Sequence, residues 1–194
     1  MSPRSAAKNE EIRRETIRKI MDSAFLLISK QGYESTSIAQ IAKEADISKG
    51  LLYNYFKSKE DLLENLIKAA LVQGDQIMSS ILTEDPATTL ENLFRWFFKE
   101  LRERPDYWRM INELAFKADK FKFVQDIAVE KWTGYTNLLQ KLFEQMGFEN
   151  SAEEAMIAAA LFDGIGIQSV VLKKDYPLSE LERILIDKYC KRKK

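Results

Sequence analysis

Apolar residues recur along this chain with the three- and four-residue spacing of helices that bury one face. A first stripe ends before Gly32, a residue suited to closing a helix, and it consists of Ile17, Ile20, Met21, Ala24 and Ile28. Similar stripes follow to the end of the chain, and no segment shows a convincing strand alternation. The pattern therefore predicts an all-α protein of nine helices with short connections.

Serine residues mark the starts of three early helices. Ser37 and Gln40 have the spacing of a capping box. Ser48 fits the N-cap of a short helix over about 48–55, and Ser58 fits the N-cap of a long helix that follows. Two short helices joined by a tight turn and braced by longer helices are typical of a helix-turn-helix.

The second short helix carries side chains suited to duplex DNA. Lys49 supplies a charge, Gly50 lets the backbone approach, and Tyr53 and Tyr55 supply hydroxyls for phosphate and rings for sugar or a thymine methyl. Lys57 and Lys59 flank the start of the next helix, whose free N–H groups suit a phosphate. A tyrosine in a helix is more often half-buried packing than a DNA contact, so the prediction rests on the joint pattern.

The second half of the chain carries most of the aromatic residues. A helical core needs such residues, but a ligand cavity between helices would use them too. We expect an apolar or aromatic small-molecule effector to be bound by Phe97, Trp108, Asn112, Phe116, Trp132 and Tyr135. Capping boxes at Ser151 with Glu154 and at Ser179 with Glu182 predict the starts of the last two helices.

The segment 155–172 is apolar on nearly all sides. Asp163, Gly164, Gly166 and Gln168 interrupt it, so we predict no membrane span. A soluble helix of this kind is buried on two sides, by its own domain and by a second subunit. An internal central helix is the alternative.

Composition narrows the function. The first 60 residues hold 11 Lys and Arg against 8 Asp and Glu, which slightly favours a DNA-facing N-terminus in a chain with no net charge. The chain has no histidine and one cysteine, Cys190, which disfavours catalytic Ser-His pairs, thiolate metal clusters and disulfides. We therefore expect a cytoplasmic protein with no cofactor, no metal, no enzymatic activity and no signal peptide.

The runs 36–45 and 48–62, TSIAQIAKEA and SKGLLYNYFKSKEDL, closely resemble the DNA-binding signature of the TetR family of transcriptional regulators. The resemblance covers about residues 14–67. It implies that Ser37 and Gln40 reach phosphate or a base edge. It also implies that a further set faces bases or anchors the DNA backbone, namely Lys49, Gly50, Leu51, Tyr53, Tyr55 and Lys59. Asp46 stands where the family usually has glycine, and aspartate tolerates the left-handed conformation that such a turn needs.

The resemblance also implies an organisation into two domains. Residues 1–58 would form the N-terminal tail and a three-helix DNA-binding domain, and residues 59–194 a six-helix domain for ligand sensing and dimerisation. The last two helices would form a four-helix homodimer interface through Ala159, Gly164, Gly166, Ile167, Val171, Leu181, Ile184 and Leu185.

The sequence thus predicts a homodimeric regulator, a repressor by family habit, that leaves a pseudo-palindromic double-stranded DNA operator when it binds a small molecule. Two other functions stay open at this point. One is an α-helical enzyme or small-molecule carrier with an aromatic cavity, and the other is a DNA binder without an effector.

Overall fold

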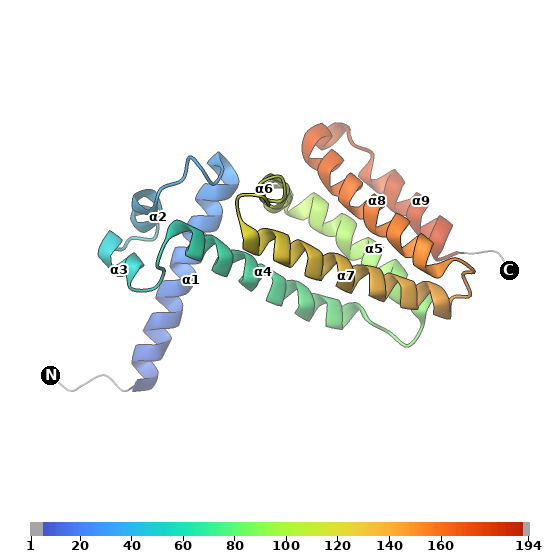
Figure 1. Ribbon diagram of the computed structural model, residues 1–194, viewed down its shortest axis with the longest axis horizontal. Coiled ribbons are helices and arrows are strands. Elements are labelled where there is room, and N and C mark those ends of the chain that lie inside the picture. The colour runs from blue at the N-terminus through green and yellow to red at the C-terminus, as the bar shows by residue number, and fades with distance from the viewer. Residues whose placement is uncertain (1–5, 192–194) are drawn as a thin grey trace. The chain divides into compact units, whose positions relative to one another are not determined.

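The computed structural model describes residues 6–191, and within that range the chain forms nine α-helices, one 3-10 turn and no strand. It folds into two compact units, Met1–Val72 and Gln73–Lys194 (Figure 1). The predicted all-α class and the count of nine helices are confirmed. The units divide inside a helix, beyond the predicted boundary at Ser58, because Leu62 and Leu66 of that helix are buried in the first unit.

The first unit contains three helices and the beginning of a fourth: α1 (Ala6–Gln31), α2 (Ile38–Glu44), α3 (Lys49–Tyr53) and α4 (Lys59–Ile81). The predicted capping box is confirmed. The backbone N–H of Gln40 donates to Ser37 Oγ at 3.2 Å, and the side-chain Oε1 of Gln40 accepts from the backbone N–H of Ser37 at 2.7 Å. Ser48 caps α3 by accepting from Leu51 N–H at 3.1 Å. These caps satisfy N–H groups that a helix start leaves unpaired.

The turn between α2 and α3 is as tight as the sequence predicts. Asp46 has a φ of 54°, in the left-handed region, and Ile47 N–H donates to the carbonyl of Ala42 at 3.0 Å. All four helices of the first unit contribute buried side chains, and the buried residues include Ile20, Ile28, Ile41, Leu52, Phe56, Leu62 and Leu63. The short helices are therefore held by burial of a few large residues.

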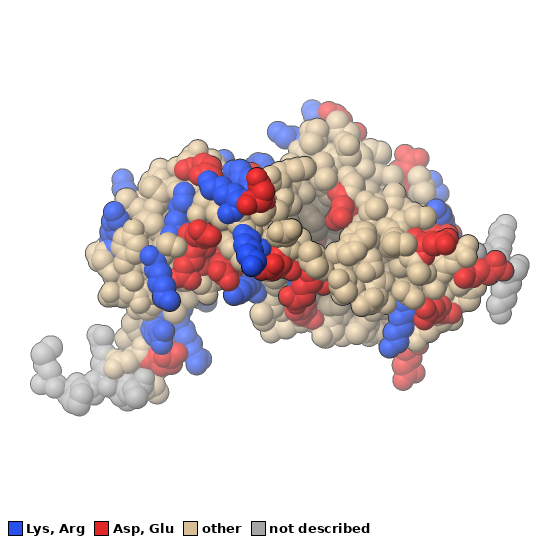
Figure 2. Space-filling model, in the orientation of Figure 1, with Lys and Arg blue, Asp and Glu red and all other residues tan. Residues whose placement is uncertain are grey.

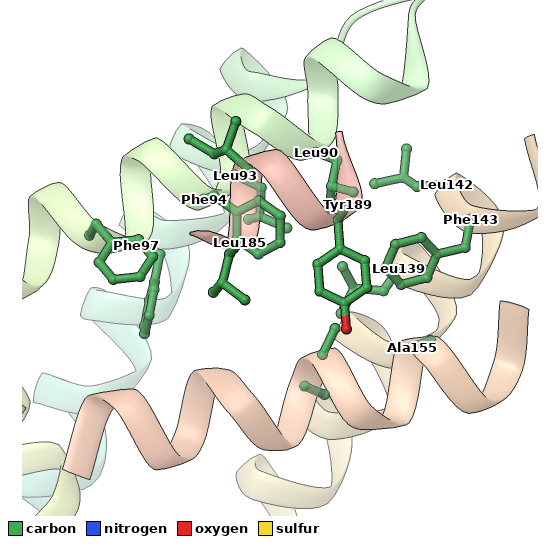
Figure 3. Packing of buried hydrophobic residues seen from close by; sticks show 14 of the residues in the cluster. Leu90, Leu93, Phe94, Phe97, Leu139, Leu142, Phe143, Ala155, Leu185 and Tyr189 are labelled. Atoms are coloured by element: carbon green, nitrogen blue, oxygen red, sulfur yellow. The ribbon is translucent and has the colours of Figure 1, made fainter. Parts of the chain in front are cut away.

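The second unit is a helical bundle made of the end of α4 together with α5 (Pro86–Glu103), α6 (Pro105–Ala115), α7 (Lys122–Gln145), α8 (Ser151–Leu172), η1 (Lys173–Asp175) and α9 (Leu178–Tyr189). Its core joins α5, α7, α8 and α9 (Figure 3). Phe94 stacks on Phe162 of α8 and on Tyr189 of α9, with ring centroids 5.4 and 6.1 Å apart. The Tyr189 hydroxyl points toward α8 in Figure 3.

The predicted capping boxes of the last two helices are wrong. Asn150 precedes α8 without a side-chain cap, and Ser151 lies inside the helix with Oγ 3.5 Å from Glu144 Oε1. Pro177 precedes α9, also without a side-chain cap. The serine–glutamate spacing indicates only that such a bond is possible, and neighbouring side chains decide whether it forms.

Candidate nucleic-acid interface and sensor surface

One buried side chain anchors α3 and leaves the rest of the helix on the surface. Leu52 is fully buried, whereas Leu51 is 37% and Tyr53 47% exposed. Lys49 and Gly50 are exposed too, and Lys49 Nζ lies 5.9 Å from the centre of the Tyr53 ring. The predicted base-facing residues therefore share an exposed face of a short, firmly seated helix.

Gly50 keeps this face open without serving any need of the chain's own packing. A Cβ atom built there would meet only Ser48 Oγ, at 4.0 Å, which is an ordinary contact. Gly50 also has no positive φ angle. The packing of the chain therefore leaves room for a side chain at Gly50 and does not itself require glycine there.

Ser37 and Gln40 are exposed at the start of α2, where the sequence predicts contacts with DNA. Their capping bonds use the serine oxygen and the glutamine carbonyl oxygen. These bonds orient both side chains before any ligand arrives. Helix starts of this kind suit phosphate, because their N–H groups carry partial positive charge.

The three remaining predicted contacts differ in their surroundings. Lys57 is exposed and its backbone N–H donates to Asp61 Oδ2 at 2.7 Å, while Tyr55 is half-buried. Lys59 Nζ donates to the carbonyls of Tyr33 and Thr36, both at 2.9 Å. Lys59 thus ties the start of α4 to the segment before α2, a structural role that the sequence did not reveal.

Basic side chains do not form a continuous field over the first unit. Figure 2 shows Lys and Arg interspersed with Asp and Glu on its visible face. This agrees with the small positive balance of the first 60 residues. Position of particular side chains, more than bulk charge, must therefore supply contacts with DNA.

The residues predicted to bind an effector fall into two groups. Phe97, Trp108 and Asn112 pack together inside the second unit: the Phe97 and Trp108 rings meet edge to face at 5.5 Å, and Asn112 Nδ2 donates to the Gly166 carbonyl at 3.4 Å. Trp132 and Tyr135 lie exposed on α7. Phe116, just after α6, is also exposed, at 75%. The first group contributes to the core, and the second offers an accessible aromatic surface.

The middle of α7 is unusually open for a helix in a bundle. Residues 125–137 contain no buried side chain, and α4 is mostly exposed over residues 68–80. Lys131 on α7 reaches across to α4, with Nζ 2.8 Å from Asp75 Oδ1. The sequence did not predict this ion pair, because its two residues are far apart in the chain.

The predicted dimer residues also separate into inner and outer sets. Ala159, Gly166 and Leu185 are buried within the second unit, and the Cβ position of Gly166 lies 3.7 Å from Trp108. Ile167 and Leu181 are half-buried. The outer set, Gly164, Val171 and Ile184, is exposed. Burial by their own unit leaves the inner three no surface to offer to a second subunit.

Further exposed apolar residues of α8 extend the outer set, and the sequence prediction missed them: Met156, Ile157, Leu161 and Leu172. The segment Ser151–Asp175 is long and apolar enough to cross a membrane by length and composition alone, and 28% of its most apolar stretch is buried. Core helices of soluble proteins meet the same criterion. The exposed apolar face of α8 is suited to contact with another apolar surface, either a lipid or a protein.

The titratable groups described in the second unit offer no candidate metal site. Residues 6–191 contain no cluster of three His, Cys, Asp or Glu able to hold a metal ion. Burial raises the pKa of the Cys190 thiol to about 12, and burial also raises the pKa of Asp163. Cys190 is therefore a neutral thiol at physiological pH, which does not suit a nucleophile.

A capped helix-turn-helix with an exposed recognition helix, joined to a helical bundle, defines the class of DNA-binding transcriptional regulators. Comparison with known proteins agrees. The family model described as bacterial regulatory proteins, tetR family, matches residues 20–66. The chain belongs to the tetR family. The family and the relatives that match this chain are described as regulators, so the alternative of an α-helical enzyme is excluded.

Individual relatives show how far the likeness extends. The fatty acid metabolism regulator protein of Bacillus subtilis is 30% identical over 129 residues, which are 66% of each protein. The biofilm operon icaADBC HTH-type negative transcriptional regulator IcaR of Staphylococcus aureus is 30% identical over 107 residues, 53% of this chain and 55% of IcaR. The chain thus spans between about half and two thirds of these relatives.

A solved structure extends the likeness in fold to most of the chain. The transcriptional regulator FadR from Bacillus subtilis in complex with stearoyl-CoA has a TM-score of 0.73 and is 23% identical in sequence. The match covers 88% of this chain and 95% of FadR. The likeness includes the second unit, which the family model does not match.

Proposed function

We propose that this protein is a cytoplasmic, ligand-responsive repressor that binds a pseudo-palindromic DNA operator as a homodimer. The observation that carries the proposal is the exposed face of α3. Its exposed residues are Lys49, Gly50, Leu51 and Tyr53, and the helix is held in place by one buried leucine, Leu52. In this proposal Ser37, Gln40, Tyr55, Lys57 and Lys59 contact the sugar-phosphate backbone. A negative regulator among the relatives favours repression over activation.

The homodimer would place two copies of α3 in successive major grooves, about 34–36 Å apart. We assign the dimer interface to the exposed face of α8 and α9, which includes Ile157, Leu161, Gly164, Val171 and Ile184. Several exposed apolar residues on such helices mark surfaces that a partner covers. The small Gly164 lets a partner helix approach closely.

The effector in this proposal is an apolar or aromatic molecule bound in the second unit. Trp132 and Tyr135 offer accessible rings, and Figure 2 shows a hollow in the largely uncharged surface of this unit. A similar protein is described as a fatty acid metabolism regulator and a similar structure contains stearoyl-CoA. Fatty acyl compounds are therefore the first ligands to test.

The proposal is tested by selecting duplexes from fragmented source DNA with the purified protein. We expect enrichment of a pseudo-palindrome, binding by a dimer in light scattering, and release on addition of an effector. The double variant Lys49→Ala/Tyr53→Phe should lose operator binding while its helical content stays unchanged. Binding with no sequence preference at low salt, or a monomer that requires detergent, contradicts the proposal.

A further inference from the structure

The ion pair between Lys131 and Asp75 lies in the least packed part of the second unit. The Lys131 side chain is 22% exposed, whereas that of Asp75 is 68% exposed. The cation is thus sheltered by the protein, and its partner projects from a solvent-facing stretch of α4. An anion that enters from solvent can therefore reach Lys131 by displacing one exposed carboxylate.

Lys131 has an environment that keeps it charged. Burial alone lowers its pKa, but the hydrogen bond to Asp75 and the nearby charges of Tyr135, Asp75 and Glu130 outweigh burial, so that the pKa is raised. A sheltered ammonium group needs a negative partner. If Asp75 moves away, an anionic group of a ligand can take its place.

The surface around Lys131 is aromatic and apolar. Tyr135 lies one helical turn further along α7, Trp132 is the next residue, and Val129 is also exposed. Burial is the largest cause of the raised pKa of Tyr135, and Lys131 and Asp75 also act on it. Exposed aromatic and apolar side chains therefore surround the sheltered cation. Such a surface fits a molecule with an apolar part and a negative group.

The other end of the ion pair belongs to the helix that enters the DNA-binding unit. Asp75 lies on α4, which is continuous from Lys59 to Ile81. The first turns of α4 are buried in the first unit, and Lys59 fastens them to the segment before α2. Asp75 therefore lies on the helix that also contributes buried residues to the first unit.

We propose that Lys131 binds the negatively charged group of an amphipathic effector, and that Asp75 occupies Lys131 as an internal competitor until the effector arrives. The exchange frees α4 from α7 and so weakens the operator-bound arrangement. This inference rests on the proposed function, which it extends by naming the charge of the effector and the residue that receives it. A fatty carboxylate and an acyl-CoA share the required chemistry.

The test uses the whole 194-residue chain. The three probes share the same hydrocarbon chain and are oleate, oleoyl-CoA and the neutral oleyl alcohol. Binding is followed by quenching of tryptophan fluorescence, and release from the selected operator by fluorescence anisotropy. We expect the wild-type protein to prefer at least one charged probe over the alcohol by about tenfold or more. Preference for oleate identifies a carboxylate source, and preference for oleoyl-CoA an acyl-CoA source.

Three variants separate the roles of the pair. Lys131→Gln should abolish the preference for the charged probe and leave affinity for the alcohol unchanged, whereas Lys131→Arg should retain the preference. Asp75→Asn should bind the charged probe about two- to fivefold more tightly, because an exposed ion pair competes only weakly. Lys141→Gln, on an exposed lysine of the same helix, is the matched control and should behave as wild type.

The outcomes distinguish this inference from the proposed function. If Lys131→Gln keeps the wild-type preference, or if the wild-type protein binds the alcohol as well as the charged probes, the inference is overturned even when operator binding and release are intact. Weaker binding by Asp75→Asn would overturn the role of internal competitor. Failure of the wild-type protein to bind any operator would instead refute the proposed function.

Discussion

The neighbours Leu51 and Leu52 make a strict test of how α3 is built. Leu52 is the buried residue of this five-residue helix, while Leu51 is exposed beside it. Truncation of either to alanine removes the same atoms from adjacent positions. We expect Leu52→Ala to destabilise the first unit and Leu51→Ala to leave its stability unchanged but weaken operator binding.

The size of the effect follows from burial. Leucine to alanine at a fully buried site costs about 2–5 kcal/mol in the free energy of unfolding. For a unit the size of Met1–Val72, each kcal/mol lowers the unfolding temperature by about 4–8 °C. A loss of about 3 kcal/mol in Leu52→Ala then lowers it by about 12–24 °C. Exposed substitutions such as Leu51→Ala change stability by about 0.5 kcal/mol or less.

The position of the tryptophans allows the two units to be followed separately. All three, Trp96, Trp108 and Trp132, lie in the second unit. Tryptophan fluorescence therefore reports unfolding of that unit, whereas far-ultraviolet circular dichroism reports both. Leu52→Ala should lower the temperature of the dichroism transition more than that of the fluorescence transition.

Operator affinity completes the test. Loss of one apolar base contact in Leu51→Ala should weaken binding by about fivefold, or about 1 kcal/mol. Leu52→Ala should regain most of its affinity on cooling, when its first unit refolds. Equal unfolding temperatures for the two variants would refute the description of α3 as a helix held by Leu52.

Three other substitutions or measurements follow from the same structure. Gly50→Ala should keep the unfolding temperature, because there is room for a Cβ, yet weaken operator binding at least tenfold in anisotropy; unchanged affinity would show that DNA does not approach there. Asp46→Ala should cost about 1 kcal/mol in thermal unfolding, because alanine tolerates a φ of 54° less well than aspartate does, and an equally stable variant would contradict this. The Cys190 thiol, with its pKa raised to about 12, should react slowly with a thiol reagent at pH 8. Because the unfolded chain ionises near the ordinary thiol pKa and the folded chain only near 12, stability contributed by Cys190 should be lost as the pH rises between these values. Fast native-state reaction at pH 8 would exclude a buried thiol.

The sequence predicted the first unit well because the signals there are local. Ser37, Ser48 and Asp46 act on backbone groups within four residues, so their types and spacing suffice to place two helices and the turn. The position of Leu52 follows in the same way from helical spacing. The sequence placed Lys59 at the start of α4 but did not predict its hydrogen bonds, because the carbonyls that it binds belong to residues more than twenty positions earlier.

The second unit was predicted less completely because its helices carry weaker local signals. Segment 155–172 is apolar on nearly all sides, so its sequence does not reveal which face the bundle buries. Ala159 and Gly166 proved to face inward, whereas Met156 and Ile157 face outward. Similarly, nothing near Lys131 in sequence indicates that Asp75 is its partner, since α4 and α7 meet only in the folded bundle.

The helix α4 contributes residues to both units. Its N-terminal turns are fixed by Leu62, Leu63 and Lys59, whereas its C-terminal half is mostly exposed and is joined to α7 through Asp75. Coupling between two binding sites typically amounts to about 1–3 kcal/mol, and a single exposed ion pair contributes about 0–1 kcal/mol. Exchange at Lys131 therefore supplies part of the coupling, and contacts of the effector's apolar portion with α4 and α7 must supply the rest. A neutral ligand of the same length would then release the operator only partly at saturation, and Lys131→Gln would reduce the response to a charged ligand to that same partial level.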